Sequence, residues 1–341
     1  MRITIKQASY AVLLGIIILG VIYSLYNFSK QNQQVPQVKN YKIGVLIDNT
    51  LFQSNLNGFK SKMEELGYKE NANTQYVVKN PNSDAKLREQ YVNEIIDSKP
   101  DLIVSASNIA TRQFKTLTSI PVVFLDIGST EGIVQNPSAP EGNITGITGG
   151  NVEFNGKRLE VLKELVPGIK KVIISPDKNF PNYAPFMKIL SAAAAELNLQ
   201  IVEIPSANSK DFVARAGSII NKKNGDAFIF FSGPNNAVNT PEDQKIIINQ
   251  LIKEKMPSIT HNMELGANIG LLIAYGVYRQ DVGKEAAVLA DSILRGIPIK
   301  ELPVFSPIKS LVLEINSATA ETIGIVIPQN LLARANKIYN E

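Results

Sequence analysis

The sequence predicts an α/β protein made of two lobes, each a doubly wound parallel sheet, joined by a hinge and preceded by one N-terminal transmembrane helix. From Tyr41 onward, short runs rich in Val, Ile and Phe alternate with amphipathic helical stretches. Strands that are apolar throughout and separated by helices indicate a parallel sheet covered on both faces. The alternation pauses at the Gly-, Thr- and Asn-rich segment 143–151 and then repeats, so we expect the hinge there.

The N-terminus carries the longest apolar run of the chain, at residues 11–28. Arg2 and Lys6 precede this run, and the first thirty residues contain no acidic side chain. Eighteen helical residues at about 1.5 Å each span ~27 Å, close to the thickness of a bilayer core. No small-residue cleavage pattern is visible, so we expect residues 1–30 to be a retained anchor, with a cleaved signal segment as the alternative. Polar residues 31–40 then form a linker, and the remainder lies on the outer side of the cell membrane.

The elements of the first lobe follow from their periodicity. Leu56, Phe59 and Met63 recur at helical spacing and Gly67 ends that helix, while Asp84 is suited to cap the next one. We expect strands at 41–48, 74–80, 101–107 and 120–127, helices at 54–66 and 84–98, and a further helix between the last two strands.

The second lobe repeats this order. We expect strands at 170–176, 199–205, 227–233 and 256–262, helices at 185–197, 209–222 and 241–255, and then a strand at 270–278, a helix at 281–296 and a strand, turn and helix at 310–324. We expect the chain to return late to the first lobe. Lobe 1 then comprises 41–148 and about 270–304, and lobe 2 comprises 149–269 and about 305–341.

Composition excludes several classes of function. The chain has no cysteine and a single histidine, which rules out disulfides and thiolate catalysis and leaves little for a metal site or a Ser-His-Asp triad. Beyond residue 30 there remain 32 basic against 31 acidic residues, with no basic stripe that would suit nucleic acid. We therefore expect no enzyme activity, no metal, no cofactor and no nucleic-acid partner.

Candidate binding residues lie where strands of the predicted sheets end, because ligands of open parallel sheets bind at the carboxyl ends of the strands. These ends are rich in short polar side chains and offer no evident nucleophile. The candidates are Asp48, Asn49, Phe52, Ser105, Ser107, Asn108, Asp126, Asn182, Ser232, Asn235, Asn236 and Glu264.

Each candidate also has a purely structural interpretation. Ser105, Ser107 and Asn108 could be helix caps, and 232–236 could be a plain turn. We interpret His261 as a structural histidine. Free N–H groups at the helix that opens near Ser107 favour an anion, and the Asp side chains favour a cation, so the predicted cleft suits a zwitterion such as an amino acid.

Blocks of sequence along most of residues 41–328 resemble the TrpX-type family of ABC transporter substrate-binding proteins, within the type I periplasmic binding protein superfamily. The blocks are IPVVFLDIG (120–128), GNITGITGG (142–150), LEVLKELVPGIKKVIISPD (159–177), DVGKEAAVLADSILRGIPIKELPV (281–304) and LVLEINSATAETIGIVIP (311–328). The chain departs from the family in lacking an anchoring cysteine and in carrying STEGIVQNPSAPEG at 129–142.

The resemblance implies capture of a small solute between two closing lobes, with aromatic amino acids and related molecules as the ligand class. It also implies delivery to an ABC permease whose ATPase is a separate subunit, since this chain has no Walker-type loop. The alternative is a membrane-anchored sensing ectodomain that signals to a partner membrane protein.

Overall fold

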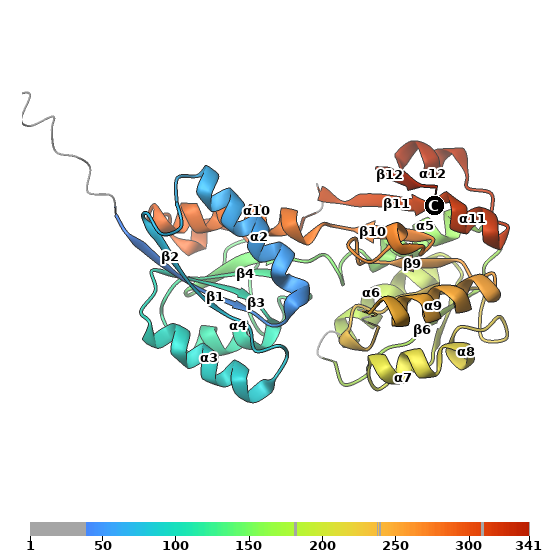
Figure 1. The fold of residues 1–341 in the computed structure, drawn as a ribbon, viewed down its shortest axis with the longest axis horizontal. Coiled ribbons are helices and arrows are strands. Elements are labelled where there is room, and N and C mark those ends of the chain that lie inside the picture. The colour runs from blue at the N-terminus through green and yellow to red at the C-terminus, as the bar shows by residue number, and fades with distance from the viewer. Residues whose placement is uncertain (1–38, 181–182, 237, 239, 308–309, 341) are drawn as a thin grey trace, which may run out of the picture. The chain divides into compact units, whose positions relative to one another are not determined.

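Two separate sheets carry the chain from Tyr41 onward (Figure 1). The computed structural model describes residues 39–340 except 181–182, 237, 239 and 308–309. The predicted anchor at 1–30 and almost all of the predicted linker lie outside the described residues. Within the described ranges, no helix is both long enough and apolar enough to cross a membrane.

The first sheet has five parallel strands in the order β2-β1-β3-β4-β5. Helices α2 and α10 cover one face and α3 and α4 the other (Figure 1). The elements are β1 (Tyr41–Ile47), η1 (Thr50–Phe52), α2 (Gln53–Glu65), β2 (Thr74–Lys79), α3 (Ala85–Asp97), β3 (Leu102–Ala106), α4 (Asn108–Leu117), β4 (Val122–Ile127), β5 (Ile144–Thr148) and α10 (Arg279–Leu294).

Side chains of the first sheet alternate between two hydrophobic layers. Ile43 and Val45 of β1 pack in the layer under α2 and α10, whereas Leu46 packs in the layer under α3 and α4. Both layers are fully buried, as expected for strands that are apolar throughout.

Two glycines bring α10 back to the first lobe. A Cβ at Gly58 of α2 would lie 1.9 Å from the carbonyl oxygen of Gln280, and one at Gly283 of α10 would lie 2.0 Å from that of Asn55. The backbones of the two helices therefore approach closely only because both positions lack a side chain.

The second sheet has seven strands in the order β12-β11-β10-β9-β8-β6-β7, and β11 is antiparallel to β10. Helices α5, α6, α11 and α12 contribute to one hydrophobic layer, and α7, α8 and α9 to the other. The elements are α5 (Asn155–Leu165), β6 (Lys171–Ile174), α6 (Tyr183–Glu196), β7 (Gln200–Glu203), α7 (Ser209–Ala214), α8 (Ala216–Ile219), β8 (Ala227–Ile229), η2 (Pro234–Asn236), α9 (Pro241–Lys253), β9 (Ser258–Thr260), η3 (Ala267–Ile269), β10 (Ile273–Gly276), β11 (Val312–Asn316), α11 (Ser317–Ile323), α12 (Gln329–Arg334) and β12 (Lys337–Tyr339). The short η4 (Ile299–Glu301) follows α10 in the first lobe.

The predicted α/β architecture with two lobes is confirmed, with three differences in detail. The expected hinge at 143–151 contains β5, which pairs with β4 of the first sheet, so the crossing begins only at Gly149. The strand expected on lobe 1 near residue 270 is β10, which pairs with β9 and belongs to the second sheet. The single helix expected at 209–222 is divided into α7 and α8 at Arg215.

Within the described residues, the chain passes between the lobes three times: after β5, between β10 and α10, and ahead of β11. Arg158 of α5 connects the first crossing to β10, just ahead of the second crossing, because its Nη1 donates to the carbonyl of Asn151 at 2.9 Å and its Nε to that of Tyr275 at 2.8 Å. Glu153 binds the first and third, accepting from the hydroxyls of Thr148 at 3.0 Å and Ser306 at 3.2 Å.

Candidate functional site

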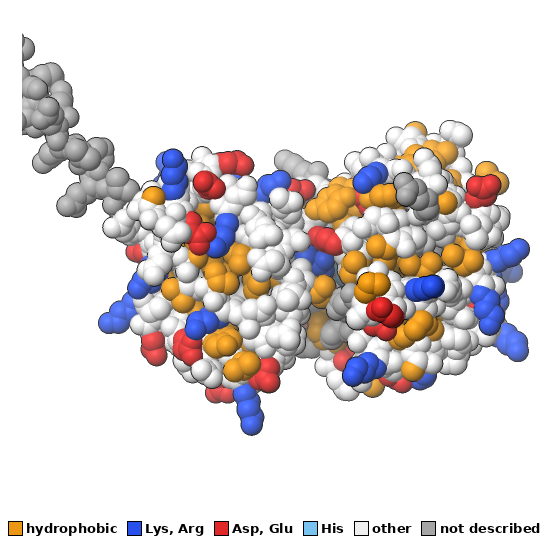
Figure 2. All heavy atoms as spheres, in the orientation of Figure 1, with side chains coloured by type: hydrophobic (Ala, Val, Ile, Leu, Met, Phe, Trp, Pro, Cys, Tyr) orange, Lys and Arg blue, Asp and Glu red, His pale blue; other side chains and the backbone are white. Residues whose placement is uncertain are grey.

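A cavity of about 360 Å³ lies where the carboxyl ends of the strands of both sheets meet. Such a volume is in the range of small-molecule sites. Segments after β1, β3 and β4 of the first lobe line one side, and segments after β8 and β9 of the second lobe line the other. In Figure 2 a groove runs between the two lobes.

Most of the residues predicted from the strand ends lie in this cavity wall. The predicted residues that line it are Asp48, Asn49, Phe52, Ser107, Asn108, Asp126, Ser232 and Asn236. Ser107 has both of the roles considered for it, since it lines the cavity and also caps α4 by accepting from Ala110 N at 3.3 Å.

Three predicted residues do not line the cavity, and Asn182 is outside the described residues. Ser105 faces the interior of the first lobe and accepts a hydrogen bond from the hydroxyl of Thr111 at 2.9 Å. Asn235 lies inside the second lobe and donates to the carbonyl of Ser175 at 2.6 Å. Glu264 stands behind the wall and binds Arg279, as described below.

Asp48 is held by a buried arginine that the sequence pattern did not identify. Arg88 of α3 donates to the carboxylate of Asp48 from Nε at 2.6 Å and from Nη2 at 3.2 Å. This bidentate ion pair fixes the orientation of Asp48 at the carboxyl end of β1 and balances its charge.

Asp126 is the most constrained residue of the site. It is the next-to-last residue of β4 and has φ of +53°, at the point where the register between β4 and β5 shifts, and it is almost entirely buried. A Cβ at Gly149 would lie 2.1 Å from its Oδ1, so the absence of a side chain at Gly149 makes room for this carboxylate. Burial raises the pKa of Asp126 to about 6, against the lowering effect of Arg279 and with a further increase from Glu264.

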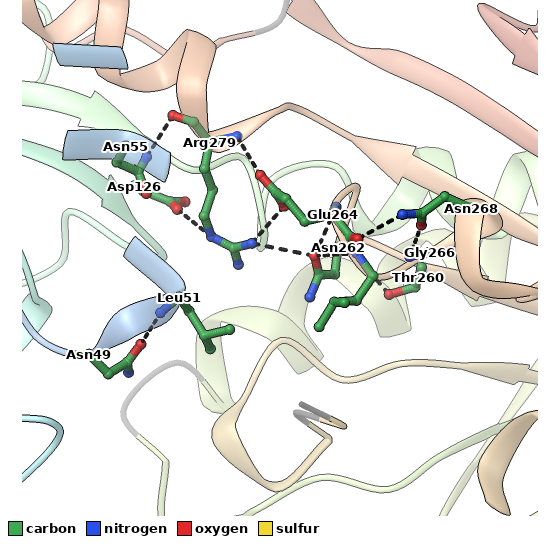
Figure 3. A network of polar contacts seen from close by, with 11 residues as sticks. Asn49, Leu51, Asn55, Asp126, Thr260, Asn262, Glu264, Gly266, Asn268 and Arg279 are labelled. Atoms are coloured by element: carbon green, nitrogen blue, oxygen red, sulfur yellow. Dashed lines mark hydrogen bonds and ion pairs between the residues drawn. The ribbon is translucent and has the colours of Figure 1, made fainter. Parts of the chain in front are cut away.

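Arg279, the first residue of α10, connects Asp126 to the second lobe (Figure 3). Its Nε faces Oδ2 of Asp126 at 3.1 Å, and its Nη1 donates to Oε2 of Glu264 at 2.7 Å. The backbone N–H of Arg279 donates to the other oxygen of Glu264 at 3.1 Å. The guanidinium also lies 6.0 Å from the ring centre of Phe52. One arginine of the cavity wall therefore joins the carboxylate of Asp126 in the first lobe to that of Glu264 in the second.

The rest of the wall is largely apolar. Phe52 of the first lobe and Phe180 and Phe230 of the second contribute aromatic surface, and Leu51, Ile109, Val238, Leu265 and Leu271 contribute aliphatic surface. Such a lining suits a ligand that carries an apolar or aromatic group in addition to its charged groups.

His261 lies in the cavity wall, although its sequence context suggested a structural role. Its Nδ1 is buried and has no hydrogen-bond partner among the described residues. Burial lowers the pKa of His261 well below its usual range, and the nearby charges of Arg158 and Arg279 lower it further. The ring is consequently neutral at physiological pH.

The chemistry of the site favours binding. Its acids are paired with arginines, and in the described part of the chain no group of three or more His, Cys, Asp or Glu side chains could hold a metal ion. Besides His261, the polar lining residues absent from the sequence prediction are Ser83, Arg88, Asn151, Thr260, Asn262 and Arg279. Arg88 and Arg279 lie on helices, so a prediction limited to the carboxyl ends of strands does not include them.

Comparisons with known proteins agree with this fold. The chain is 23% identical over 288 residues to a protein of Clostridioides difficile named "Tyrosine-binding protein", covering 82% of this chain and 79% of that one. A conserved domain protein from Vibrio cholerae has a similar structure, with a TM-score of 0.78 at 22% identity over 88% of this chain and all of that one. An ABC domain from Streptococcus pneumoniae in complex with L-Trp gives a TM-score of 0.76 at 20% identity over the same shares.

The resemblance seen in the sequence is confirmed by the family comparison. The sequence profile described as "ABC transporter substrate binding protein" matches residues 42–339, which is nearly the whole described part of the chain. The fold, the cavity between the lobes and this match lead to one conclusion: the chain belongs to the family of ABC transporter substrate-binding proteins.

Proposed function

We propose that this protein captures a free amino acid, with aromatic amino acids as the favoured class, in the cavity between its lobes. The observation that carries the proposal is the composition of the cavity wall. The wall combines two acid–base pairs, Asp48 with Arg88 and Asp126 with Arg279, with the aromatic surface of Phe52 and its neighbours. Glu264 of the second lobe holds Arg279 from behind the wall.

The proposed mechanism is conformational and forms no covalent bond. The ligand contacts both lobes, so it favours the closed arrangement by its differential affinity for that state. The crossings tied by Arg158 and Glu153 are the hinge for this motion. The names of the similar proteins, one tyrosine-binding and one bound to L-Trp, support the aromatic class.

We further propose that the protein hands its ligand to an ABC permease served by a separate ATPase subunit. The apolar run at residues 11–28 supports attachment to the cell membrane by one span, with the binding unit on the outer side. A permease and an ATPase encoded next to this chain, together with recovery of the protein in the membrane fraction, are the corresponding tests.

A thermal-shift screen tests the ligand class. The purified full-length chain is melted with each of the twenty amino acids and with a set of sugars and nucleosides. A ligand at 100 times its Kd stabilises the folded state by about 2.7 kcal/mol, which raises the melting temperature measurably. We expect shifts with tyrosine, tryptophan or phenylalanine. Shifts with sugars or nucleosides and none with amino acids would refute the proposal.

A further inference from the structure

The guanidinium of Arg279 uses only part of its hydrogen-bonding capacity. Nε faces Asp126 at 3.1 Å, and Nη1 serves both Glu264 at 2.7 Å and Asn262 at 3.3 Å. No described residue accepts a hydrogen bond from Nη2, and this nitrogen carries no dashed line in Figure 3. A charged N–H donor in a cavity wall therefore remains available for a ligand.

Asn262 presents a second free donor beside it. The side-chain oxygen of Asn262 accepts from Glu264 N at 3.1 Å, from Leu265 N at 3.2 Å and from Nη1 of Arg279 at 3.3 Å. Reversing the amide would turn its NH₂ group toward three donors, so the orientation is fixed. Nδ2 consequently has no hydrogen-bond partner within the described ranges.

The two free nitrogens face the same space. Figure 3 shows both of them on the side of the network where Leu51 lies, and Leu51, Asn262 and Arg279 all line the cavity. Arg279 begins a helix that packs on the first lobe, while Asn262 follows β9 of the second. A group bound by both donors would therefore link the lobes.

We propose that Nη2 of Arg279 and Nδ2 of Asn262 bind the carboxylate of the amino-acid ligand, with Glu264 as the positioning residue for the guanidinium. The proposal rests on the proposed function and specifies how that ligand is oriented. Adjacent N–H donors, one of them cationic, complement the two oxygens of a carboxylate.

The charges around Arg279 define the ligand further. Asp126 and Glu264 both contact the guanidinium, so this group of three carries one negative charge in excess. A ligand that adds only a carboxylate increases the excess, whereas an ammonium beside the carboxylate offsets it. The site therefore selects a zwitterion over the corresponding acid without an amino group.

Titration calorimetry with the wild-type full-length chain tests the ligand chemistry. The probes are L-tyrosine, L-tyrosinamide, tyramine and 3-(4-hydroxyphenyl)propionate, or the tryptophan series if tryptophan is the tighter amino acid. We expect the amide and the amine to bind on the order of 10- to 100-fold more weakly than the amino acid, because each loses a charge-assisted contact with both donors. The propionate is also expected to bind more weakly.

Asn262→Asp tests the location. Aspartate keeps the oxygen that accepts the three N–H groups but replaces the free donor by an anion, so amino-acid affinity is expected to fall at least tenfold while tyramine binding does not fall. Asn268→Asp is the matched control, since it adds the same charge in the same connection between β9 and β10, at a residue of η3 that does not line the cavity. Melting temperatures show that both variants are folded.

The outcomes distinguish failure of the carboxylate site from failure of the proposed amino-acid capture. Equal affinity of the amino acid and its amide overturns the carboxylate site. A weakened amide together with unchanged amino-acid affinity in Asn262→Asp also overturns it, because the carboxylate is then bound elsewhere in the cavity. If none of the twenty amino acids gives heat of binding, the proposed function is overturned, and the carboxylate site with it. If Asn262→Asp does not fold, the wild-type ligand series still decides.

Discussion

Replacing Gly149 by alanine tests whether the carboxylate of Asp126 is held in the orientation described. Gly149 is the first residue after β5, where the chain leaves the first lobe. An added Cβ would lie 2.1 Å from Oδ1 of Asp126 and 3.0 Å from Nδ2 of Asn151. Contacts this short cannot persist, so either the carboxylate or the crossing segment must move.

The expected cost follows from what holds Asp126 in place. Its backbone is fixed at a strand irregularity with φ of +53°, and rotating the side chain away breaks the 3.1 Å ion pair with Arg279. Inserting a methyl group into a packed site costs about 1–3 kcal/mol. We expect Gly149→Ala to lower the free energy of unfolding by that amount, measured by urea denaturation, and to weaken amino-acid binding.

Two controls make this prediction specific. A Cβ at Gly168 meets no atom within 4 Å, so Gly168→Ala is expected to change stability little. In an Asp126→Ala background the clash is absent, so the cost of Gly149→Ala is expected to shrink by about 0.5–3 kcal/mol in a double-mutant cycle. Equal costs of Gly149→Ala in both backgrounds, or equal costs at Gly149 and Gly168, would show that the added Cβ does not press on the carboxylate of Asp126.

Three further predictions concern buried charges. Burial raises the pKa of Asp126 from 3.8 to about 6, so the folded state holds this proton more tightly than the unfolded chain; its contribution to stability is complete below pH 3.8 and is lost as pH rises through about 6. The difference in stability between wild type and Asp126→Asn, followed against pH, should show that loss, and a pH-independent difference would contradict it. Burial lowers the pKa of His261 well below 6.5, so the stabilisation from its neutral ring is lost as pH falls below 6.5. The NMR signals of this single histidine are expected to keep the shifts of a neutral ring at pH 6. A titration midpoint of the ring near 6.5 would be inconsistent with this. Arg158→Met leaves the carbonyls of Asn151 and Tyr275 without their donor, which costs about 1–3 kcal/mol of folding free energy for each carbonyl. Denaturation is expected to show a larger loss of stability than for the exposed control Arg334→Met. Equal losses would contradict the role of Arg158 at the crossings.

The elements that could be predicted from sequence are those set by local periodicity. Strand β1 and helices α2 and α3 lie within one or two residues of their expected positions, and Asp84 caps α3 as expected, accepting from Leu87 N at 2.9 Å. The lobe to which β10 belongs depends on its pairing with Ile259 and Thr260 of β9, which no local pattern reports. Segment 143–151 was interpreted as a hinge from its glycines, yet Gly146 serves the close packing of Phe124 on β5.

The candidate site divides in the same way. Side chains directly after a strand, such as Asp48 and Ser107, could be identified because the carboxyl ends of parallel strands meet at one edge. Ser105 could not be separated from Ser107 without the structure, since it lies within β3 and faces α4. Arg279 was missed because α10 reaches the cavity only through the close contact of Gly58 and Gly283 with the facing backbones.

The distance between the lobes, measured with and without ligand, shows whether the two lobes close on an amino acid. The chain has no cysteine, so Lys86→Cys on α3 and Lys210→Cys on α7 give two spin labels without background. Both helices lie on the lower side of Figure 1, away from the crossings. Pulsed EPR on the full-length chain is expected to show a shorter and narrower distance distribution with saturating L-tyrosine or L-tryptophan than without. An unchanged distribution under conditions where calorimetry shows the site to be full would contradict capture between the lobes.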